Sequence, residues 1–328
     1  MCNDINLSII IPVYNVEAFL AQCLDSVFRL NYTNFEVLCI DDGSTDGSMD
    51  ILKDYALKYP NLRIIHLQHN GASAVRNRGI AEAVGDYLFF LDSDDFILYP
   101  ETLLELLQIS KKHEVDVCFF NALVNGESLY VDSMPSCNQC LTGSEMMTLF
   151  YNSCRTIPTP VWVQLFRRSF LIDSHLRQKE DSYHEDELFT PSLLYLAKKV
   201  ICINKPVVHY RLLRQGAVTT QYGDKYYRDW VNIARDLYAF FNQKNVSEEE
   251  PYRQVFGVYI QLADLLYSKG LVFSNYLKKE DYIIMSACAK TDYEKKSYRL
   301  AQLSPKLMYK YRQNKLPKIV RKMINRWL

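Results

Sequence analysis

The chain has 328 residues, of which 48% are hydrophobic and 23% charged, with 38 basic side chains against 38 acidic ones. This composition is typical of a folded protein with one large core or two smaller ones, and it excludes a disordered or low-complexity chain. No apolar run approaches the roughly 20 residues of a membrane-spanning helix, and the start MCNDINLSIIIPVYN lacks the basic region of a signal peptide.

Strand-like and helix-like patterns alternate through the first part of the chain. The β-branched run LSIIIPV (7–13) is typical of a parallel strand that is buried on both faces. Further strands are predicted at 35–41, 62–67, 86–92 and 115–120, and helices at 16–28, 49–59, 72–83 and 100–112. This alternation predicts an α/β fold, with a doubly wound, mostly parallel sheet and helices on both faces.

The second half is less periodic. Helices are predicted at 144–152 and 184–199, short strands in VICI and VVHYR, and further helices at 226–241, 252–269 and 275–289. The aromatic-rich stretch at 159–171 shows no clear period. The change to a helical pattern predicts an α/β domain at 1–220 and a helical C-terminal region at 221–328.

The nine cysteines are an odd number in mostly apolar contexts, which favours buried thiols and a reducing, cytoplasmic location over a disulfide framework. Cys137 and Cys140 form a single CxxC, and without a second pair two incidental thiols are favoured over a zinc site.

Polar residues follow four of the predicted parallel strands, as PVYN, DDGSTD, QHNGAS and DSDD. The carboxyl ends of parallel strands meet at one edge of the sheet, where open α/β sheets bind their ligands. Neither GxGxxG after the first strand nor GxxxxGK[ST] is present, which argues against a classical dinucleotide site and a P-loop NTPase.

The stretch FLDSDDF (90–96) places Asp92, Asp94 and Asp95 within four positions behind an apolar run. Like charges at a buried strand end repel one another, and a divalent cation such as Mn²⁺ or Mg²⁺ would offset that repulsion. Because such a cation also bridges phosphates, the stretch predicts a site for a metal and a sugar nucleotide.

Six blocks in order carry a resemblance to a known family: IIIPVYNVEAFL, FEVLCIDDGSTDGS, HNGASAVRNRGI, GDYLFFLDSDDF, HEDELF and HYRLLRQGAVT. In order and spacing they resemble glycosyltransferase family 2 over residues 5–220. The resemblance implies a GT-A fold and a metal-dependent, inverting enzyme of cell-surface polysaccharide synthesis. Its donor would be a nucleoside-diphosphate sugar, a UDP-sugar first of all, and its acceptor a saccharide or lipid-linked hydroxyl, with no nucleic acid partner.

The family pattern also implies roles for single residues. Those implied to bind the nucleotide sugar are Pro12, Val13, Tyr14, Glu17, Asp42, Arg76, Asp92, Asp94 and Arg211. Asp94 and Asp95 match the metal-binding positions, and Asp186 matches the general base. Three alternatives stay open at this point. Asp92 shares the DxD spacing and could be the metal-binding partner in place of Asp94. Glu185 and Asp186 could be caps of the helix they begin, and Trp162 could be either the floor of a sugar site or a core residue.

Two other functions share part of this pattern. A nucleotidyltransferase also uses a doubly wound sheet and paired acids, but PVYNVEAF lacks the glycines and basic residue that such an enzyme carries after its first strand. An inactive sugar-nucleotide-binding module would lack the base or a metal ligand, whereas Asp95 and Asp186 are both present.

The tail at 306–328 carries eight Lys or Arg and no acidic residue, which leaves the rest of the chain at 30 minus 38, or −8. After Pro317 the apolar residues recur at three- and four-residue spacing with basic residues between them, which predicts a short amphipathic helix. Either this helix packs on the protein, or it lies on an anionic membrane surface and makes the protein peripheral at the inner face.

Overall fold

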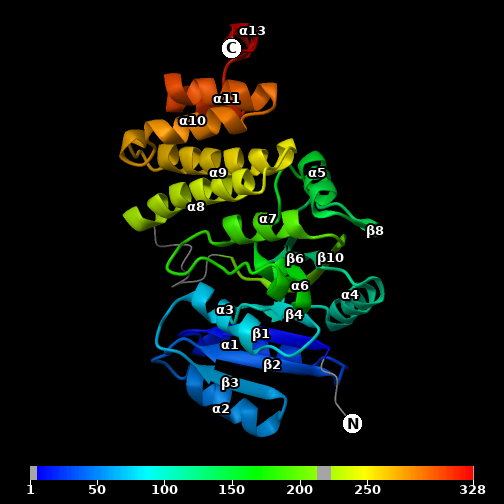
Figure 1. Cartoon of the computed structure of the whole chain (residues 1–328). Coiled ribbons are helices and arrows are strands. Elements are labelled where there is room, and N and C mark those ends of the chain that lie inside the picture. Colours follow the sequence, from blue (N-terminus) through cyan, green and yellow to red (C-terminus); the bar gives the residue numbers. More distant parts are fainter. Residues whose placement is uncertain (1–5, 213–222, 328) are drawn as a thin grey trace. The chain divides into compact units, whose positions relative to one another are not determined.

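The structure is a computed structural model that describes residues 6–212 and 223–327 (Figure 1). The chain divides into two compact units, Met1–Thr220 and Gln221–Leu328. Among the described residues, no helix is both long enough and apolar enough to cross a bilayer.

The first unit is built on one mixed sheet of ten strands, with the strand order β3-β2-β1-β4-β9-β6-β10-β5 along its main path. The strands are β1 (Leu7–Val13), β2 (Phe35–Asp41), β3 (Leu62–His66), β4 (Tyr87–Phe90), β5 (Phe96–Ile97), β6 (Val117–Val124), β7 (Ser128–Leu129), β8 (Cys137–Leu141), β9 (Gln164–Arg167) and β10 (Val200–Tyr210). The helices are α1 (Glu17–Phe28), α2 (Ser48–Lys58), α3 (Ala72–Glu82), α4 (Pro100–His113), α5 (Gly143–Ser153), α6 (Arg168–Asp173) and α7 (Asp186–Leu196), with the short 3-10 helix η1 (Val161–Val163). The predicted α/β fold is confirmed.

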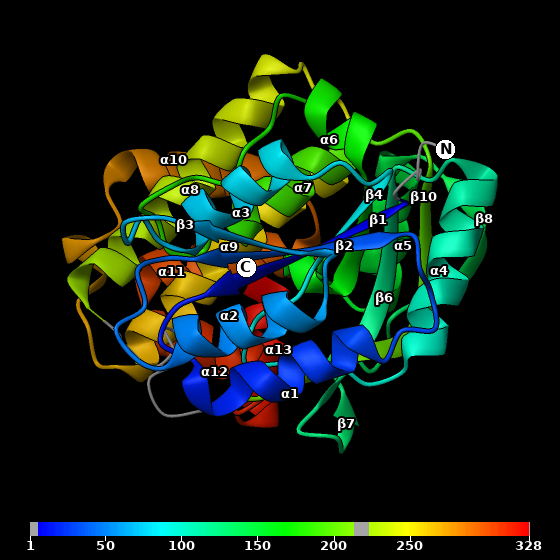
Figure 2. The same cartoon turned by 90° about the horizontal axis from the view of Figure 1, so that it is seen from below.

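The parallel part of the sheet follows the predicted pattern. β1 pairs in parallel with β2 and with β4, and β2 with β3. The apolar run of β1 is buried almost throughout, because α1 and α2 cover one face of β1–β3 and α3 covers the other (Figure 2). The strands β1 and β2 therefore end at the same edge, and the loops behind them lie together.

The other half of the sheet differs from the simple alternation. β9 lies between β4 and β6 and runs antiparallel to both. Residues 115–120, expected as a fifth strand, therefore contribute the start of β6, and β9 separates that strand from β4. The two short strands expected in VICI and VVHYR form one irregular strand, β10, which pairs in parallel with β6.

The second unit is helical, as predicted. It contains α8 (Asp224–Gln243), α9 (Glu249–Ser268), η3 (Phe273–Asn275), α10 (Lys279–Cys288), α11 (Asp292–Leu303), α12 (Pro305–Arg312) and α13 (Lys318–Trp327). The buried Asp281 carboxylate receives two hydrogen bonds from Arg235, each of 2.7 Å, and one of 2.8 Å from the Tyr259 hydroxyl. A buried carboxylate with this many donors stabilises the unit because its charge and its lone pairs are both satisfied.

The predicted tail helix is present as α13 and packs on its neighbours within the second unit. The Tyr311 hydroxyl donates to Asn325 Oδ1 at 3.2 Å, and Lys296 Nζ donates to the Asn325 carbonyl oxygen at 3.2 Å. The Arg321 guanidinium lies 5.5 Å from the centre of the Tyr311 ring. Ile324 is buried, whereas Met323 is 57% exposed. The helix thus has one packed side and keeps at least one apolar side chain at the surface.

Candidate active site

The loops that follow β1 and β2 are joined by side-chain hydrogen bonds. Asn15 Oδ1 accepts from the Thr45 N–H at 2.8 Å, and Glu17 Oε2 accepts from the Gly47 N–H at 2.6 Å. In return, the Glu17 N–H donates to Asp46 Oδ2 at 3.0 Å. Glu17 therefore links the two loops, and its role as a nucleotide ligand stays a prediction.

Pro12 and Val13 form the last two positions of β1, paired in register with Ile40 and Asp41 of β2. The resemblance implies that they line the base pocket, and that role stays a prediction. The next residue, Tyr14, is 43% exposed and its ring lies 4.3 Å, centre to centre, from that of His69. His69 was not predicted, since a lone histidine in a polar loop carries no periodic signal.

Asp42 holds the turn that leads into α3. Its two carboxylate oxygens accept the Asn70 and Gly71 N–H groups at 2.7 and 2.8 Å. Gly71 has φ +87°, a left-handed conformation that costs glycine nothing. Since His69 Nδ1 also lies 3.5 Å from Asp42 Oδ2, the structure places Asp42 beside the exposed Tyr14–His69 pair.

The DSDD loop follows β4. Asp95 is 1% exposed, and its Oδ1 accepts the Arg211 N–H at 2.7 Å. Burial, and then the carboxylates of Asp94 and Asp92, raise the pKa of Asp95 to about 8. A buried carboxyl group repelled by two neighbouring acids would be stabilised in its charged form by a cation, so these residues fit a divalent metal. Even so, the described residues contain no group of three or more His, Cys, Asp or Glu arranged to hold one.

Arg211, at the end of β10, joins the DSDD loop to α1. Its Nη1 donates to the Asp94 carbonyl oxygen and its Nη2 to Gln22 Oε1. The guanidinium lies 5.2 Å from the ring centre of Phe19 and 5.1 Å from that of Phe96. The structure thus brings Arg211 to the predicted metal-binding loop.

Arg76 lies on α3, and its side chain is only 8% exposed. Its Nη2 lies 2.9 Å from Asp92 Oδ1 and its Nη1 lies 3.0 Å from Glu185 Oε1. Burial alone would lower the pKa of Arg76, but the surrounding carboxylates, Asp92 first, raise it above its ordinary value. The guanidinium thus bridges the DSDD loop and the HEDELF segment, while the predicted diphosphate contact remains untested.

Asp186 begins α7, directly after Glu185. Its Oδ1 is buried and has no hydrogen-bond partner within the described part of the chain. Burial, and then the neighbouring Glu185 carboxylate, raise the pKa of Asp186 well above its ordinary value, and Arg76 opposes the shift. A carboxylate with a raised pKa and an unpartnered oxygen is suited to accept a proton.

The start of α7 is anchored from the side by β9 and the turn before it. Gln164 Nε2 donates to Thr190 Oγ1 at 3.2 Å, and Thr159 Oγ1 donates to Glu187 Oε1 at 3.1 Å. The aromatic stretch that showed no clear period in the sequence therefore helps to place Asp186.

Trp162 is 6% exposed and its ring lies 4.8 Å from that of Tyr210 and 4.9 Å from that of Tyr130. These contacts favour the core interpretation over the sugar floor. The ring of His209 stacks on that of Phe96, with 4.4 Å between the ring centres.

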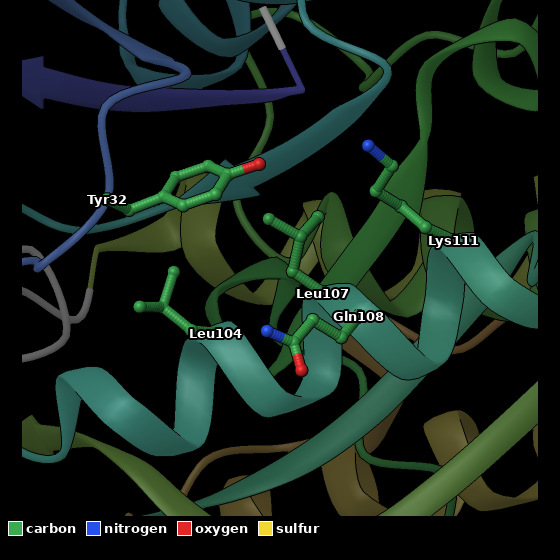
Figure 3. A pocket seen from close by; sticks show the side chains of 5 residues that line it. All are labelled: Tyr32, Leu104, Leu107, Gln108 and Lys111. Carbon is green, nitrogen blue, oxygen red and sulfur yellow. The ribbon is translucent and has the colours of Figure 1, made fainter.

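A surface hollow of about 240 Å³ lies away from these residues, along α4. Figure 3 shows Leu104, Leu107, Gln108 and Lys111 on α4, with Tyr32 across from them. The Tyr32 hydroxyl accepts from Asn6, the residue before β1, at 3.0 Å. The hollow therefore lies towards the amino ends of the strands, on the opposite edge from the predicted site.

Comparison with known proteins gives matches to glycosyltransferases. The sequence profile of glycosyl transferase family 2 matches residues 8–170. An uncharacterized glycosyltransferase of Escherichia coli K12, YibD, is 31% identical over 253 residues, which are 72% of this chain and 72% of that protein. A poly(ribitol-phosphate) β-glucosyltransferase of Bacillus spizizenii is 32% identical over 64% of this chain but only 32% of its own length.

The fold also matches a solved structure. The crystal structure of S. aureus TarS 1-349 in complex with UDP-GlcNAc has a TM-score of 0.69 and 21% identity, covering 95% of this chain and 93% of that one. Together with the family match, this likeness confirms the predicted GT-A type of fold with a helical C-terminal region.

Proposed function

The chain belongs to glycosyltransferase family 2, and on that premise we propose that it transfers a sugar from a UDP-sugar to a hydroxyl group of a saccharide or lipid-linked acceptor. One observation carries this proposal: the buried Oδ1 of Asp186 lacks a hydrogen-bond partner within the described residues. A carboxylate in that state suits the acceptance of a proton from an attacking hydroxyl. The reaction would serve cell-surface polysaccharide synthesis.

The donor side of the proposal rests on the loops after β1 and β2. The base of the nucleotide would stack on the exposed face of the Tyr14–His69 pair, beside Asp42 and the Pro12–Val13 strand end. A carboxylate has about four lone-pair sites, so Asp42 can hold two backbone N–H groups and still accept from a base. One related structure contains UDP-GlcNAc, which favours a UDP-sugar among the nucleotide sugars.

The enzyme is proposed to depend on Mn²⁺ or Mg²⁺ held by Asp94 and Asp95. Such a cation, when bound, neutralises negative charge on the leaving diphosphate. Asp92 would lie nearby as a donor contact, and its carboxylate is held by Arg76. Arg211 holds the loop backbone and adds positive charge on the same side.

Asp186 is proposed as the general base, and the contacts of its neighbours explain why. Glu185 and Asp92 both pair with Arg76, so each of these carboxylates already has a cationic partner. Asp186 is then the acid best placed to take the proton. One carboxylate base without a carboxylate nucleophile implies a single displacement, and therefore inversion at the anomeric carbon.

Location and acceptor complete the proposal. A cytoplasmic enzyme with α13 on the anionic inner leaflet would meet a lipid-linked acceptor at the membrane surface. Lys318 and Arg321 on α13 would each contribute about 1 kcal/mol near such a surface. One relative is named for action on poly(ribitol-phosphate), which supports a polymer of the cell surface as the acceptor class.

The experiment that tests this function is donor hydrolysis across a panel of nucleotide sugars with Mn²⁺, Mg²⁺ or a chelator. We expect slow release of UDP from at least one UDP-sugar, dependent on the cation. Release of pyrophosphate from a nucleoside triphosphate and a sugar phosphate would instead identify a nucleotidyltransferase. Binding of UDP-sugars without turnover, with or without an acceptor saccharide, would identify an inactive binding module.

A further inference from the structure

The buried guanidinium of Arg76 connects two segments that lie far apart in the sequence. Asp92 is 16 residues away and Glu185 is 109 residues away, yet both carboxylates lie within 3.0 Å of Arg76 nitrogens. Asp92 belongs to the donor-side loop, and Glu185 directly precedes the proposed base. Arg76 thus lies between the donor and acceptor sides of the proposed reaction.

The next residue of α3 holds the same acceptor-side segment in a second way. Asn77 Oδ1 accepts the Gln178 N–H at 2.9 Å, and Asn77 Nδ2 donates to the Gln178 carbonyl oxygen at 2.9 Å. The helix itself is pressed onto the sheet, since a Cβ at Gly79 would lie 2.5 Å from Ile10 Cγ2. A helix fixed to β1 and bonded to 178–185 is a rigid support for the turn that carries Asp186.

We propose that Arg76 is a positioning residue: its two ion pairs fix the Glu185–Asp186 turn against the DSDD loop and place a positive charge beside the base. This role rests on the proposed function, because it assigns Arg76 to the base instead of to the diphosphate. It also explains why the Arg76 guanidinium is buried: without it, Asp92 on one side and Glu185 on the other would repel each other.

The groups that face Asp186 come from several elements. Glu185 directly precedes it, Glu187 follows it on α7, Asp92 lies on the DSDD loop, and the Arg76 guanidinium acts on it electrostatically from α3. The charges of Glu187 and Asp186 also raise the pKa of the buried Tyr130 phenol, after burial and Tyr210. In this acidic surrounding, removal of the guanidinium would leave Asp186 to keep its proton up to a higher pH.

The test is a comparison of Arg76→Met and Arg76→Lys with Arg78→Met as the matched control. Arg78 lies on the same helix, is half exposed and pairs at the surface with Glu82 at 2.7 Å. Donor affinity is measured by calorimetry with UDP-sugar and Mn²⁺, and kcat is measured from pH 5.5 to pH 9 as UDP release. We expect the Kd of the donor to stay within about twofold in R76M while kcat at neutral pH falls by about 100-fold.

The pH profile separates positioning from a merely structural role. Because Arg76 lowers the pKa of Asp186, its removal should move the rising limb of kcat to higher pH by about one unit or more. R76K should recover part of both effects, and R78M should match the wild type. If R76M does not fold, R76K carries the same comparison, and the double variant R76M/E185Q removes one of the acids left unpaired.

Two outcomes would overturn the proposal. A donor Kd weakened tenfold or more with kcat unchanged would make Arg76 a ligand of the diphosphate. A lower kcat with an unmoved pH limb would make it structural only. Failure of the proposed function gives a different result, because the wild type itself would then release UDP from no donor. The coupling between R76M and E185Q in the free energy of unfolding would still report the ion pair.

Discussion

At the scale of single residues, the aspartates of the site differ in their surroundings and therefore in their expected roles. Asp42 is satisfied by two backbone N–H groups, and Asp92 by a guanidinium. Asp95 is buried among other acids, and one oxygen of Asp186 has no partner among the described residues. The motifs in the sequence indicated which acids matter. They could not indicate that Arg76 pairs with Glu185, because that contact spans 109 residues.

The metal-binding loop yields the first prediction. Asp95→Asn keeps an oxygen that can accept the Arg211 N–H but removes a carboxyl group whose charged form is disfavoured by burial and by Asp94 and Asp92. In chelator we expect the variant to melt about 2–4 °C above the wild type, which corresponds to about 1 kcal/mol for a unit of this size. With UDP and Mn²⁺, the wild type should gain stability and the variant should not, as measured by calorimetric melting.

A matched control is Asp86→Asn, an exposed acid just before β4, which should leave both melting temperatures unchanged. The cation assignment would be wrong if Mn²⁺ and UDP stabilised D95N as strongly as the wild type.

At the scale of helices and strands, periodic segments were predicted well and short ones were not. The apolar run of β1 and the helical spacing of α1 are strong local signals, and both elements lie where the sequence placed them. β9 has four residues within an aromatic stretch, too few to show a period of two. α11 and α12 were not predicted because charged residues interrupt their apolar spacing, and their burial is decided by packing within the second unit.

The contact between α5 and α7 yields a prediction on stability. A Cβ at Gly143 would lie 1.6 Å from the Leu194 carbonyl oxygen, a backbone atom that cannot turn away. We expect Gly143→Ala to lower the free energy of unfolding by about 3 kcal/mol, the upper part of the usual range for overpacking. Because α7 carries Asp186, turnover should fall as well.

The matched substitution is Gly257→Ala, in the middle of α9, where an added Cβ meets no atom within 4 Å. It should raise stability by about 0.5–1 kcal/mol, because alanine loses less backbone entropy in a helix. Urea unfolding of both variants measures the difference. Equal stability of the two variants would contradict the close packing of α5 on α7.

At the scale of the whole molecule, the chain combines a sheet unit with a helical unit whose last helix is basic. The family match ends at residue 170, and the six motifs end before the helical unit begins. The basic tail could be predicted from the sequence as a helix. Its packing against Tyr311 and Lys296 could not be predicted, since those contacts join residues of three different helices.

The tail yields the prediction at this scale. Removal of residues 316–328 deletes α13 but keeps α12, whose Met308 and Tyr311 are buried. We expect the full chain to float with vesicles that contain anionic lipid, and the truncated chain to lose that binding while it keeps its fold. The double variant Lys318→Glu/Arg321→Glu should bind less, since each lost basic residue removes about 1 kcal/mol.

Vesicles of neutral lipid and a series at rising salt complete that experiment, because attraction to a charged surface weakens with salt. Flotation of the truncated chain as strong as that of the full chain, or none by the full chain, would leave α13 as a packing helix only.

The role of Asp186 as the base of a UDP-sugar transferase is the central claim. The most direct measurement compares wild type and Asp186→Asn for donor affinity and for kcat of UDP release, with the donor identified in the panel. Asn keeps the size of the side chain but cannot take the proton, so kcat should fall by about 10²–10⁴ while the donor Kd stays within about twofold. Turnover by D186N at the wild-type rate, or loss of donor binding in parallel with kcat, would contradict the account.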